Sequence, residues 1–119
     1  MPRKKEPEPP KPLLSDTALE LVALRFRALS EPMRLKLLNV MMQGEHTVGQ
    51  LVEASGSGQA NVSKHLAMLR DAGMIGMRKE GLSTWCYIAD PVVNELCEMM
   101  CRRLREEMEA KARAFDPTI

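Results

Sequence analysis

Apolar residues recur at helical spacing along the first part of this chain. A first run, residues 16–29, begins after the capping residue Ser15, and its apolar side chains fall on nearly every side of a helix. A second run is expected to start at Ser30 as its cap, with Pro32 in its first turn, and to end at Gly44. Its predicted buried stripe consists of Met33, Leu37, Leu38, Met41 and Met42. A helix that is apolar on most sides is covered on more than one side, so residues 16–29 lie deep in the domain or between two subunits.

Two shorter helical patterns follow, joined by the turn Gly56-Ser57-Gly58. They cover residues 47–55 and 59–71. The apolar face of the first is formed by Val48, Leu51 and Val52, and that of the second by Val62, Leu66 and Leu69. A glycine-rich turn between two short helices is typical of a helix-turn-helix. The outer face of the second helix has no bulky apolar residue, which leaves it free to meet a polar partner.

The rest of the chain predicts a β-hairpin and one long helix. Residues 74–89 form two short stretches of strand type around a turn at residues 80–83. Asp90 is expected to cap, and Pro91 to open, a charged helix that runs to about residue 114. Its apolar stripe consists of Val93, Leu96, Cys97, Met100, Leu104 and Met108. Together with the helix over residues 16–29, this helix is expected to lie between two subunits.

Length and composition fit one small domain with a flexible end. The chain has 119 residues, of which 45% are hydrophobic and 28% charged, so it can bury a core. Residues 1–12 contain five prolines, four basic and two acidic residues, which predicts a flexible tail. The single DNA-binding and dimerisation domain is then expected over residues 13–115.

The charge of the chain limits how it can bind nucleic acid, and its cysteines indicate the cellular compartment. The 17 basic and 16 acidic residues give a net charge of +1, so any contact with nucleic acid must come from a local basic patch. Aromatic residues make up only 3% of the chain, which argues against base stacking on single strands. No window approaches the roughly 20 apolar residues of a membrane span. Three cysteines without a secretory signal indicate the reducing cytoplasm.

The order of elements predicts a mainly α protein with a small β-hairpin, a winged helix-turn-helix. Two segments, LSEPMRLKLL at residues 29–38 and VSKHLAMLRDAGMI at residues 62–75, resemble the ArsR/SmtB family of bacterial repressors, in its metalloid-sensing form. The resemblance covers about residues 18–108. It implies a homodimer that binds double-stranded operator DNA and leaves it when a metal ion, a metalloid or a thiol oxidant reacts with the protein.

The predicted recognition helix and hairpin carry the candidate DNA-binding residues. They are Ser57, Gln59, Asn61, Ser63, Lys64, Arg78 and Lys79. A helix in the major groove reads base edges with its first turns, so Gln59 is the strongest candidate for a base contact. Ser57 and the start of the helix can hold a phosphate, whereas Arg78 and Lys79 on the hairpin can reach the DNA backbone or the minor groove. In a dimer, two-fold symmetry spaces the two recognition helices about one DNA turn apart.

Cys97 and Cys101 are separated by one helical turn in the last helix, so both thiols lie on one face. Their Cβ atoms, roughly 6 Å apart, are too distant for a disulfide within an intact helix, which needs about 3.8 Å. Two thiolates at this spacing can chelate one soft ion, and As(III) or Sb(III) is the predicted inducer. Cys86 on the hairpin is a candidate third ligand. The alternative is that these cysteines only pack as small apolar residues.

The resemblance also narrows the inducer, because two of the family's other metal sites are missing. Residues 47–52 contain no cysteine for a zinc, lead or cadmium site, and no histidine follows His65 for the zinc site of the last helix. Persulfide sensors of the family use a cysteine of the second helix, and residues 33–43 have none. A redox-responsive repressor and a constitutive DNA-binding protein remain the alternatives. His65 fits a structural role, and we expect no enzymatic activity because no cysteine and histidine are placed as a catalytic pair.

Overall fold

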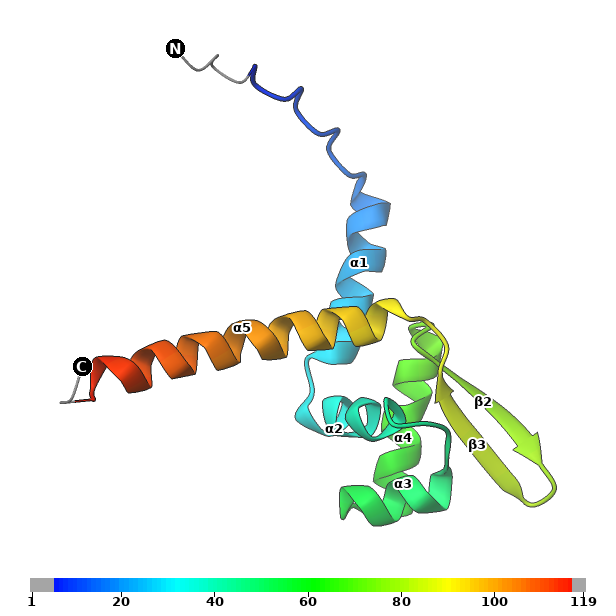
Figure 1. Ribbon diagram of the computed structural model, residues 1–119. Helices are drawn as coiled ribbons and strands as arrows, with labels where there is room; N and C mark the ends of the chain where they lie inside the picture. Colours follow the sequence, from blue (N-terminus) through cyan, green and yellow to red (C-terminus); the bar gives the residue numbers. More distant parts are fainter. Residues whose placement is uncertain (1–5, 117–119) are drawn as a thin grey trace.

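The computed structural model describes residues 6–116 and confirms the predicted winged helix-turn-helix (Figure 1). The elements follow in the order α1 (Asp16–Leu29), α2 (Pro32–Met41), β1 (His46–Thr47), α3 (Val48–Ser55), α4 (Gln59–Asp71), β2 (Ile75–Glu80), β3 (Ser83–Ile88) and α5 (Val92–Ala114). Residues 6–14 are exposed and have no regular secondary structure. Residues 1–5 of the expected tail lie outside the described residues, so its flexibility and the domain limits of 13–115 stay predictions.

Local capping chemistry fixes where α1 and α3 begin. The Ser15 side-chain oxygen accepts a hydrogen bond from the backbone N–H of Ala18 at 3.1 Å, as expected for the cap of α1. Thr47 and Gln50 form a reciprocal capping box at the start of α3, with bonds of 2.9 and 3.1 Å. Gly56 ends α3 with a φ of 70°, a left-handed conformation that favours glycine. The turn into α4 is therefore set by residues 47–58 themselves.

One predicted cap is wrong and another is displaced by a residue. Ser30 does not cap α2: its hydroxyl donates to the carbonyl oxygen of Arg27 at 2.7 Å and closes the end of α1 instead. Glu31 precedes α2 without a side-chain capping bond. The Asp90 carboxylate does accept the backbone N–H of Val92 at 3.0 Å, although α5 begins at Val92. Both differences move a boundary without changing the order of elements.

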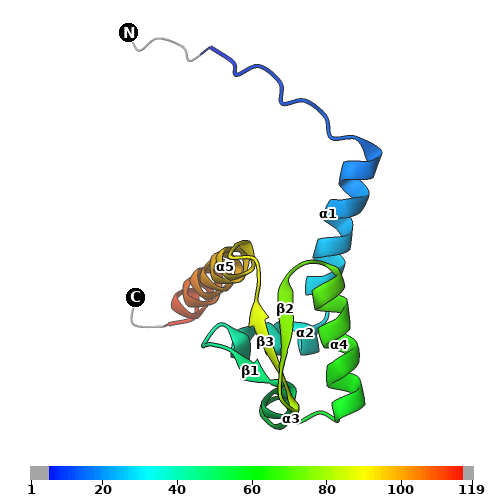
Figure 2. The same ribbon diagram turned by 90° about the vertical axis from the view of Figure 1, so that its right-hand side faces the viewer.

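The hairpin belongs to a three-stranded antiparallel sheet with the order β1-β3-β2 (Figure 2). Strands β2 and β3 are the predicted pair, and Gly81 allows their tight turn with a φ of 61°. Strand β1 was not predicted. It pairs His46 with Cys86 and Thr47 with Trp85, and two residues are too short to display an alternating pattern. This extra pair fixes the hairpin against the start of α3.

The core lies where α2, α3, α4 and the inner face of the sheet meet. Its largest fully buried side chains are Leu37, Leu38, Leu51, Val62, Leu66, Leu69, Met74, Cys86 and Val93. Met33 and Met42, predicted to be buried, are only half-buried, because Met33 lies in the first turn of α2 and Met42 follows its last residue. The inward positions of the helix-turn-helix are those predicted, which leaves the opposite side of α4 exposed.

A buried arginine ties the recognition helix to α1. Arg34 is only 8% exposed, and its guanidinium donates to the carbonyl oxygens of Ala28 at 2.7 Å and Arg27 at 3.0 Å. The same group lies 3.1 Å from Nδ1 of His65 and 3.4 Å from the sulfur of Met68, both in α4. Because these bonds satisfy the last carbonyls of α1 and hold the inner face of α4, Arg34 sets how the two helices lie.

Helices α1 and α5 project from the body of the molecule (Figure 1). The radius of gyration is 19.8 Å, against about 14 Å for a compact domain of this length. Both helices expose large apolar side chains: Leu19, Leu21, Val22, Leu24 and Phe26 in α1, and Leu96, Met99, Met100, Leu104 and Met108 in α5. Within the described residues, no helix is long and apolar enough to cross a membrane.

Candidate DNA-binding surface and dithiol pocket

The exposed side of α4 presents the polar residues that the sequence singles out. Gln59, Asn61, Ser63 and Lys64 are all exposed, whereas Ser57 in the preceding turn is half-buried. The Asn61 amide donates to the Ser57 hydroxyl at 2.8 Å, so these two side chains hold each other. Gln59, Ser63 and Lys64 are left facing solvent at the start of the helix, where a base edge or a phosphate can be reached.

A polar groove lies between α4 and the hairpin, with a volume of about 500 Å³. It is lined by Thr47, Val48, Gly49, Gln59, Ser63, Met77, Leu82, Ser83 and Thr84. Sequence reasoning found Gln59 and Ser63 but missed the hydroxyl groups of Thr47, Ser83 and Thr84. The polar turn beside Gly81 was the available signal for the last two. The groove brings the starts of α3 and α4 and the tip of the hairpin onto one surface.

Arg78, expected to contact DNA, is held by acidic side chains. Its guanidinium donates to both carboxylate oxygens of Glu45, at 2.7 and 2.8 Å, and lies 3.3 Å from the Glu80 carboxylate. It also lies 5.9 Å from the ring centres of Trp85 and Tyr87, so it crosses β3 to reach the residue before β1. The hydrogen bond from Arg78 lowers the pKa of the Glu45 carboxyl, and this effect outweighs the opposing effect of desolvation. In this arrangement Arg78 braces the sheet.

The other basic side chains of this surface are less engaged with acidic groups than Arg78 is. Lys64 and Lys79 are exposed, and within the described residues no ion pair engages either of them. Arg70 lies 3.6 Å from the neighbouring Asp71 carboxylate. The local positive charge that faces solvent is therefore carried by the two lysines.

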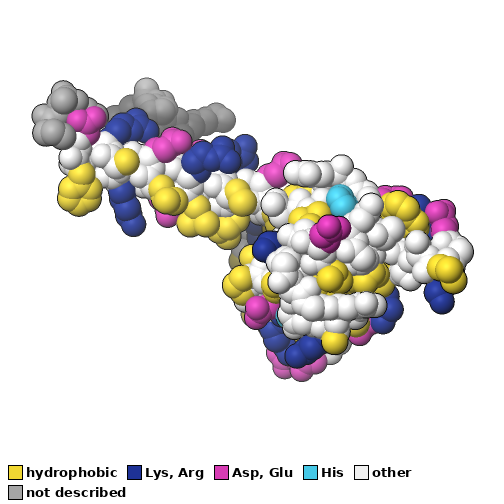
Figure 3. All heavy atoms as spheres, turned by 90° about the horizontal axis from the view of Figure 1, so that it is seen from below, with side chains coloured by type: hydrophobic (Ala, Val, Ile, Leu, Met, Phe, Trp, Pro, Cys, Tyr) yellow, Lys and Arg dark blue, Asp and Glu magenta, His cyan; other side chains and the backbone are white. Residues whose placement is uncertain are grey.

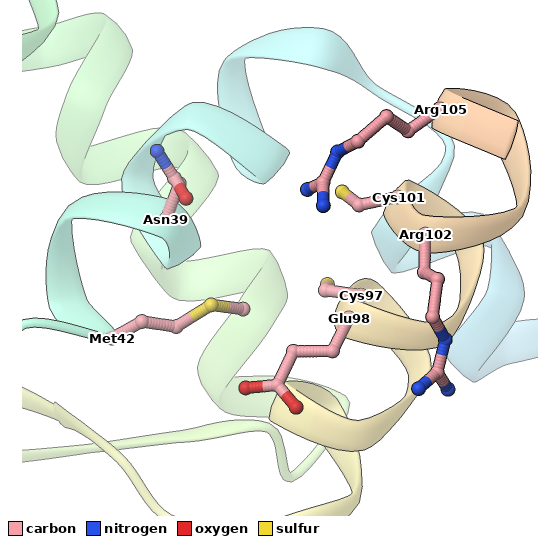
Figure 4. Close-up of a pocket in the computed structure, with 7 residues that line it drawn as sticks. All are labelled: Asn39, Met42, Cys97, Glu98, Cys101, Arg102 and Arg105. Carbon is pink, nitrogen blue, oxygen red and sulfur yellow. The ribbon is translucent and has the colours of Figure 1, made fainter. Parts of the chain in front are cut away.

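Cys97 and Cys101 line a second pocket, with a volume of about 310 Å³, between α5 and the end of α2 (Figure 4). Its other lining residues are Asn39, Met42, Glu98, Arg102 and Arg105. Both thiols are free; Cys97 is half-buried and Cys101 is exposed. The two side chains open on the same side of α5, toward Asn39 and Met42 (Figure 4). The pocket thus combines the predicted pair of thiols with residues that the sequence did not associate with it.

Cys86 lies apart from this pocket. It is 0% exposed on the inner face of the sheet, opposite Met77 of β2 and His46 of β1. Within residues 6–116, no group of three or more His, Cys, Asp or Glu side chains is placed to hold a metal ion. Cys86 is therefore part of the core, and one chain brings two of the three predicted thiol ligands together.

The environment of the thiols keeps two of them protonated. Burial raises the pKa of the Cys97 thiol, and the neighbouring Cys101 adds to the rise. Burial also raises the pKa of Cys86. A raised pKa lowers the fraction of thiolate at neutral pH, and with it the rate of reaction with oxidants.

Both histidines have structural partners. His65 contacts the Arg34 guanidinium, as described above, which agrees with the structural role predicted for it. His46 Nδ1 lies 2.7 Å from the carbonyl oxygen of Gly44. Neither histidine lines the dithiol pocket.

Comparison with known proteins points to bacterial regulators. The description of the bacterial regulatory protein arsR family matches residues 31–76, which span α2 to the start of β2. The probable mercury resistance operon repressor of Streptomyces lividans is 40% identical over 85 residues. This match covers 71% of the present chain and 67% of that protein.

Solved structures share this fold over most of the chain. A homodimeric winged helix-turn-helix DNA-binding domain from Mycobacterium bovis is 29% identical, with a TM-score of 0.74, and the match covers 82% of this chain and 93% of that one. The antimony-specific transcriptional repressor AntR matches with a TM-score of 0.75 over 92% of this chain and 99% of its own. At 24% identity, that second likeness shows the fold alone. From the sequence relationship and the shared fold, the chain belongs to the ArsR family of bacterial regulatory proteins.

Proposed function

We propose that the protein is a homodimeric transcriptional repressor that binds operator DNA through α4 and the hairpin. The observation that carries this proposal is the single polar surface made by α4, the start of α3 and the hairpin tip. A recognition helix that exposes Gln59, Ser63 and Lys64 can read base edges and contact phosphates from the major groove. Free thiols fit the reducing cytoplasm, where operator DNA is found.

The exposed apolar faces of α1 and α5 support dimerisation through these helices. Figure 3 shows hydrophobic side chains gathered along one side of the α5 arm. Contiguous apolar surface of this extent is uncommon on a monomer and is typical of an interface. The solved domain from Mycobacterium bovis is homodimeric, which supports a dimer of the present chain. A two-fold axis would then place two copies of α4 on successive major grooves.

The dithiol pocket is the proposed inducer site, with As(III) or Sb(III) as the inducer. Cys97 and Cys101 supply two soft ligands on one helical turn. Burial raises the pKa of the Cys97 thiol, so an ion that binds there must displace its proton. The hydroxides of trivalent arsenic and antimony supply the base themselves, since each thiol proton leaves as water. For Cys97, the raised pKa also lowers the fraction of thiolate that reacts with oxidants.

Mercury(II) is a second candidate inducer. The observation that favours it is the sequence relationship to a probable mercury resistance operon repressor, at 40% identity. Two thiols on one helical turn are also a sufficient donor set for a soft ion that binds sulfur. A mercury sensor would use the same two cysteines, so the two candidates differ in the ion and share the site.

Contacts near the C-terminal end of α1 provide a route from the pocket to the DNA-binding surface. Arg25 of α1 lies 3.1 Å from the Asp90 carboxylate at the start of α5, and Arg34 joins the last carbonyl oxygens of α1 to α4. A change in how α5 lies in the dimer would therefore be transmitted to α4. By reciprocity, operator binding must weaken inducer binding by the same factor as the inducer weakens operator binding.

Fluorescence anisotropy of the reduced protein tests the DNA-binding proposal. The probe is a labelled duplex from the region upstream of the protein's own gene, with a scrambled duplex as the control. We expect tight binding to the first duplex that weakens steeply as salt is raised. Equal affinity for both duplexes would contradict operator recognition, and a monomer in sedimentation at the same concentration would contradict the dimer.

Replacing Gln59 by alanine should reduce sequence preference more than it reduces non-specific binding. A well-placed amide contact to a base is worth about 1–3 kcal/mol of discrimination. The ratio of the affinities for the upstream and scrambled duplexes is therefore expected to fall by about tenfold or more. An unchanged ratio would show that Gln59 does not read a base.

Glu45→Gln should strengthen DNA binding. The substitution removes an acid beside the proposed interface and releases Arg78 to reach a phosphate. Each added phosphate contact steepens the slope of log affinity against log salt by about 0.9, which a salt series measures. Glu109→Gln, an equal charge change near the far end of α5, is the matched control and should leave the slope unchanged. An unchanged slope in Glu45→Gln would mean that Arg78 only braces the sheet.

A further inference from the structure

The dithiol pocket lacks a third thiol for a trivalent metalloid. As(III) and Sb(III) form three bonds, and one chain supplies two cysteines here. The third cysteine, Cys86, is fully buried in the core, and residues 6–116 hold no cluster of three metal-ligating side chains. Within one chain, the third bond of the ion is therefore left for a group that the ion itself brings.

Two polar side chains of the pocket are placed to meet such a group. Arg105, one helical turn beyond Cys101, points from α5 across the pocket toward α2 (Figure 4). Asn39 faces it from α2, whereas Arg102 runs along α5 and away from α2 (Figure 4). The guanidinium carries N–H donors, and the Asn39 amide, whose oxygen lies on the pocket side in Figure 4, supplies an acceptor for a hydroxyl hydrogen. The two groups flank the side of the pocket on which the thiols open.

We propose that Arg105 and Asn39 bind the oxygen that a trivalent metalloid keeps when Cys97 and Cys101 hold it. This inference rests on the proposed function of the same pocket, and it names the ligand as an oxygen-bearing trivalent metalloid. Hydrogen bonds from a guanidinium to such an oxygen are charge-assisted and therefore stronger than those between neutral groups.

The binding step is a ligand exchange without oxidation or reduction. Arsenous acid, As(OH)₃, carries three hydroxyl groups. Each of the two thiols forms one As–S bond and gives its proton to a departing hydroxyl group, so two molecules of water leave. One As–OH bond remains, and arsenic stays trivalent. The volume of about 310 Å³ leaves room for this hydroxyl group beside the ion.

Two arsenic probes separate the oxygen contact from the thiol contact. Arsenite keeps one oxygen when two thiols bind it, whereas phenylarsine oxide gives up its oxygen and keeps only the phenyl group. Binding of each probe to the reduced full-length protein is followed by sulfur-to-arsenic charge-transfer absorbance. We expect Arg105→Met to weaken arsenite binding by about tenfold, the size of one charge-assisted hydrogen bond, and to leave phenylarsine oxide binding unchanged.

Matched variants complete the design. Asn39→Ala should also weaken arsenite alone, by a smaller factor, whereas Arg102→Met should change the affinity for neither probe. Met42→Leu tests the thioether that faces Cys97 in Figure 4, and it should leave arsenite binding unchanged. X-ray absorption of the arsenite complex should give two As–S bonds and one As–O bond.

Each contrary result has a distinct meaning. Equal affinities of Arg105→Met and the unchanged protein for arsenite would overturn the inference, as would an equal loss for both probes or an arsenic bound by three sulfurs. Binding of phenylarsine oxide without arsenite would also overturn it, while the dithiol site would stand. If the unchanged protein bound neither probe, the proposed inducer site itself would fail.

Discussion

Replacing Cys101 by serine is expected to abolish release from the operator at arsenite concentrations that empty it in the unchanged protein. The serine hydroxyl is a hard, neutral ligand that cannot replace a thiolate, so the concentration for half-release should rise by about 100-fold. Cys101 is exposed, and its loss should leave folding and operator affinity intact. Anisotropy of the DNA complex under arsenite titration measures both quantities.

Cys86→Ala is the matched control for this prediction, because it removes a thiol outside the pocket. The variant is expected to be less stable, since Cys86 is fully buried, but still to be released by arsenite. Loss of release in Cys86→Ala, with its fold intact, would make Cys86 a ligand. If Cys101→Ser left the operator at the same arsenite concentration as the unchanged protein, the dithiol pocket would not be the inducer site.

Arg34→Met should lower the free energy of unfolding by about 3 kcal/mol. The substitution removes the guanidinium that donates to the Ala28 and Arg27 carbonyl oxygens, and an unsatisfied buried polar group costs about 1–3 kcal/mol. The Arg27 oxygen keeps the Ser30 hydroxyl as a donor. His65 loses its partner at the same time. Urea denaturation at fixed protein concentration measures the change. Arg70→Met, which removes an exposed arginine of α4, should stay within about 0.5 kcal/mol of the unchanged protein.

The same variant should bind operator DNA more weakly, because α4 is no longer held against the end of α1. We expect the loss in Arg34→Met at temperatures where circular dichroism shows that the protein is fully folded. Unchanged stability would contradict the role given to the Arg34 hydrogen bonds. Unchanged operator affinity in the folded variant would show that they do not position the recognition helix.

The elements of the fold could be predicted because they depend on local chemistry. Residues 59–71 have apolar side chains at helical spacing and lie between Gly58 and Gly73, and the structure places a helix over the same residues. The cap at Ser15 and the hairpin turn at Gly81 are likewise set by neighbours in sequence. Strand β1 could not be foreseen, since two residues show no period and its existence depends on pairing with β3.

Long-range partners explain most of what the sequence concealed. Arg78 and Glu45 are 33 positions apart, so a basic residue that looked available for DNA is paired in the fold. Arg34 and His65 are 31 positions apart, and neither pattern nor composition indicates that a buried guanidinium joins α1 to α4. Side-chain pairs of this kind form only when the elements pack together, and they produce no periodic pattern in the sequence.

Only the cysteine pair of the dithiol site could be predicted from the sequence. Cys97 and Cys101 are one turn apart in a single helix, and that relation survives in any packing of α5. Asn39 comes from α2, and its place beside the thiols depends on how α2 and α5 meet. Arg105 shares the cysteines' spacing along α5, which was the signal that could have associated it with them.

The central claim is that the pair Cys97 and Cys101 releases the protein from its operator when it binds a trivalent metalloid. The most direct test adds arsenite to the reduced protein bound to its labelled upstream duplex, beside a variant in which both cysteines are serine. We expect the unchanged protein to leave the DNA, and the variant to bind with equal affinity and to stay bound. Release of both proteins at the same arsenite concentration, or release of the unchanged protein only by a persulfide donor or an oxidant, would contradict it.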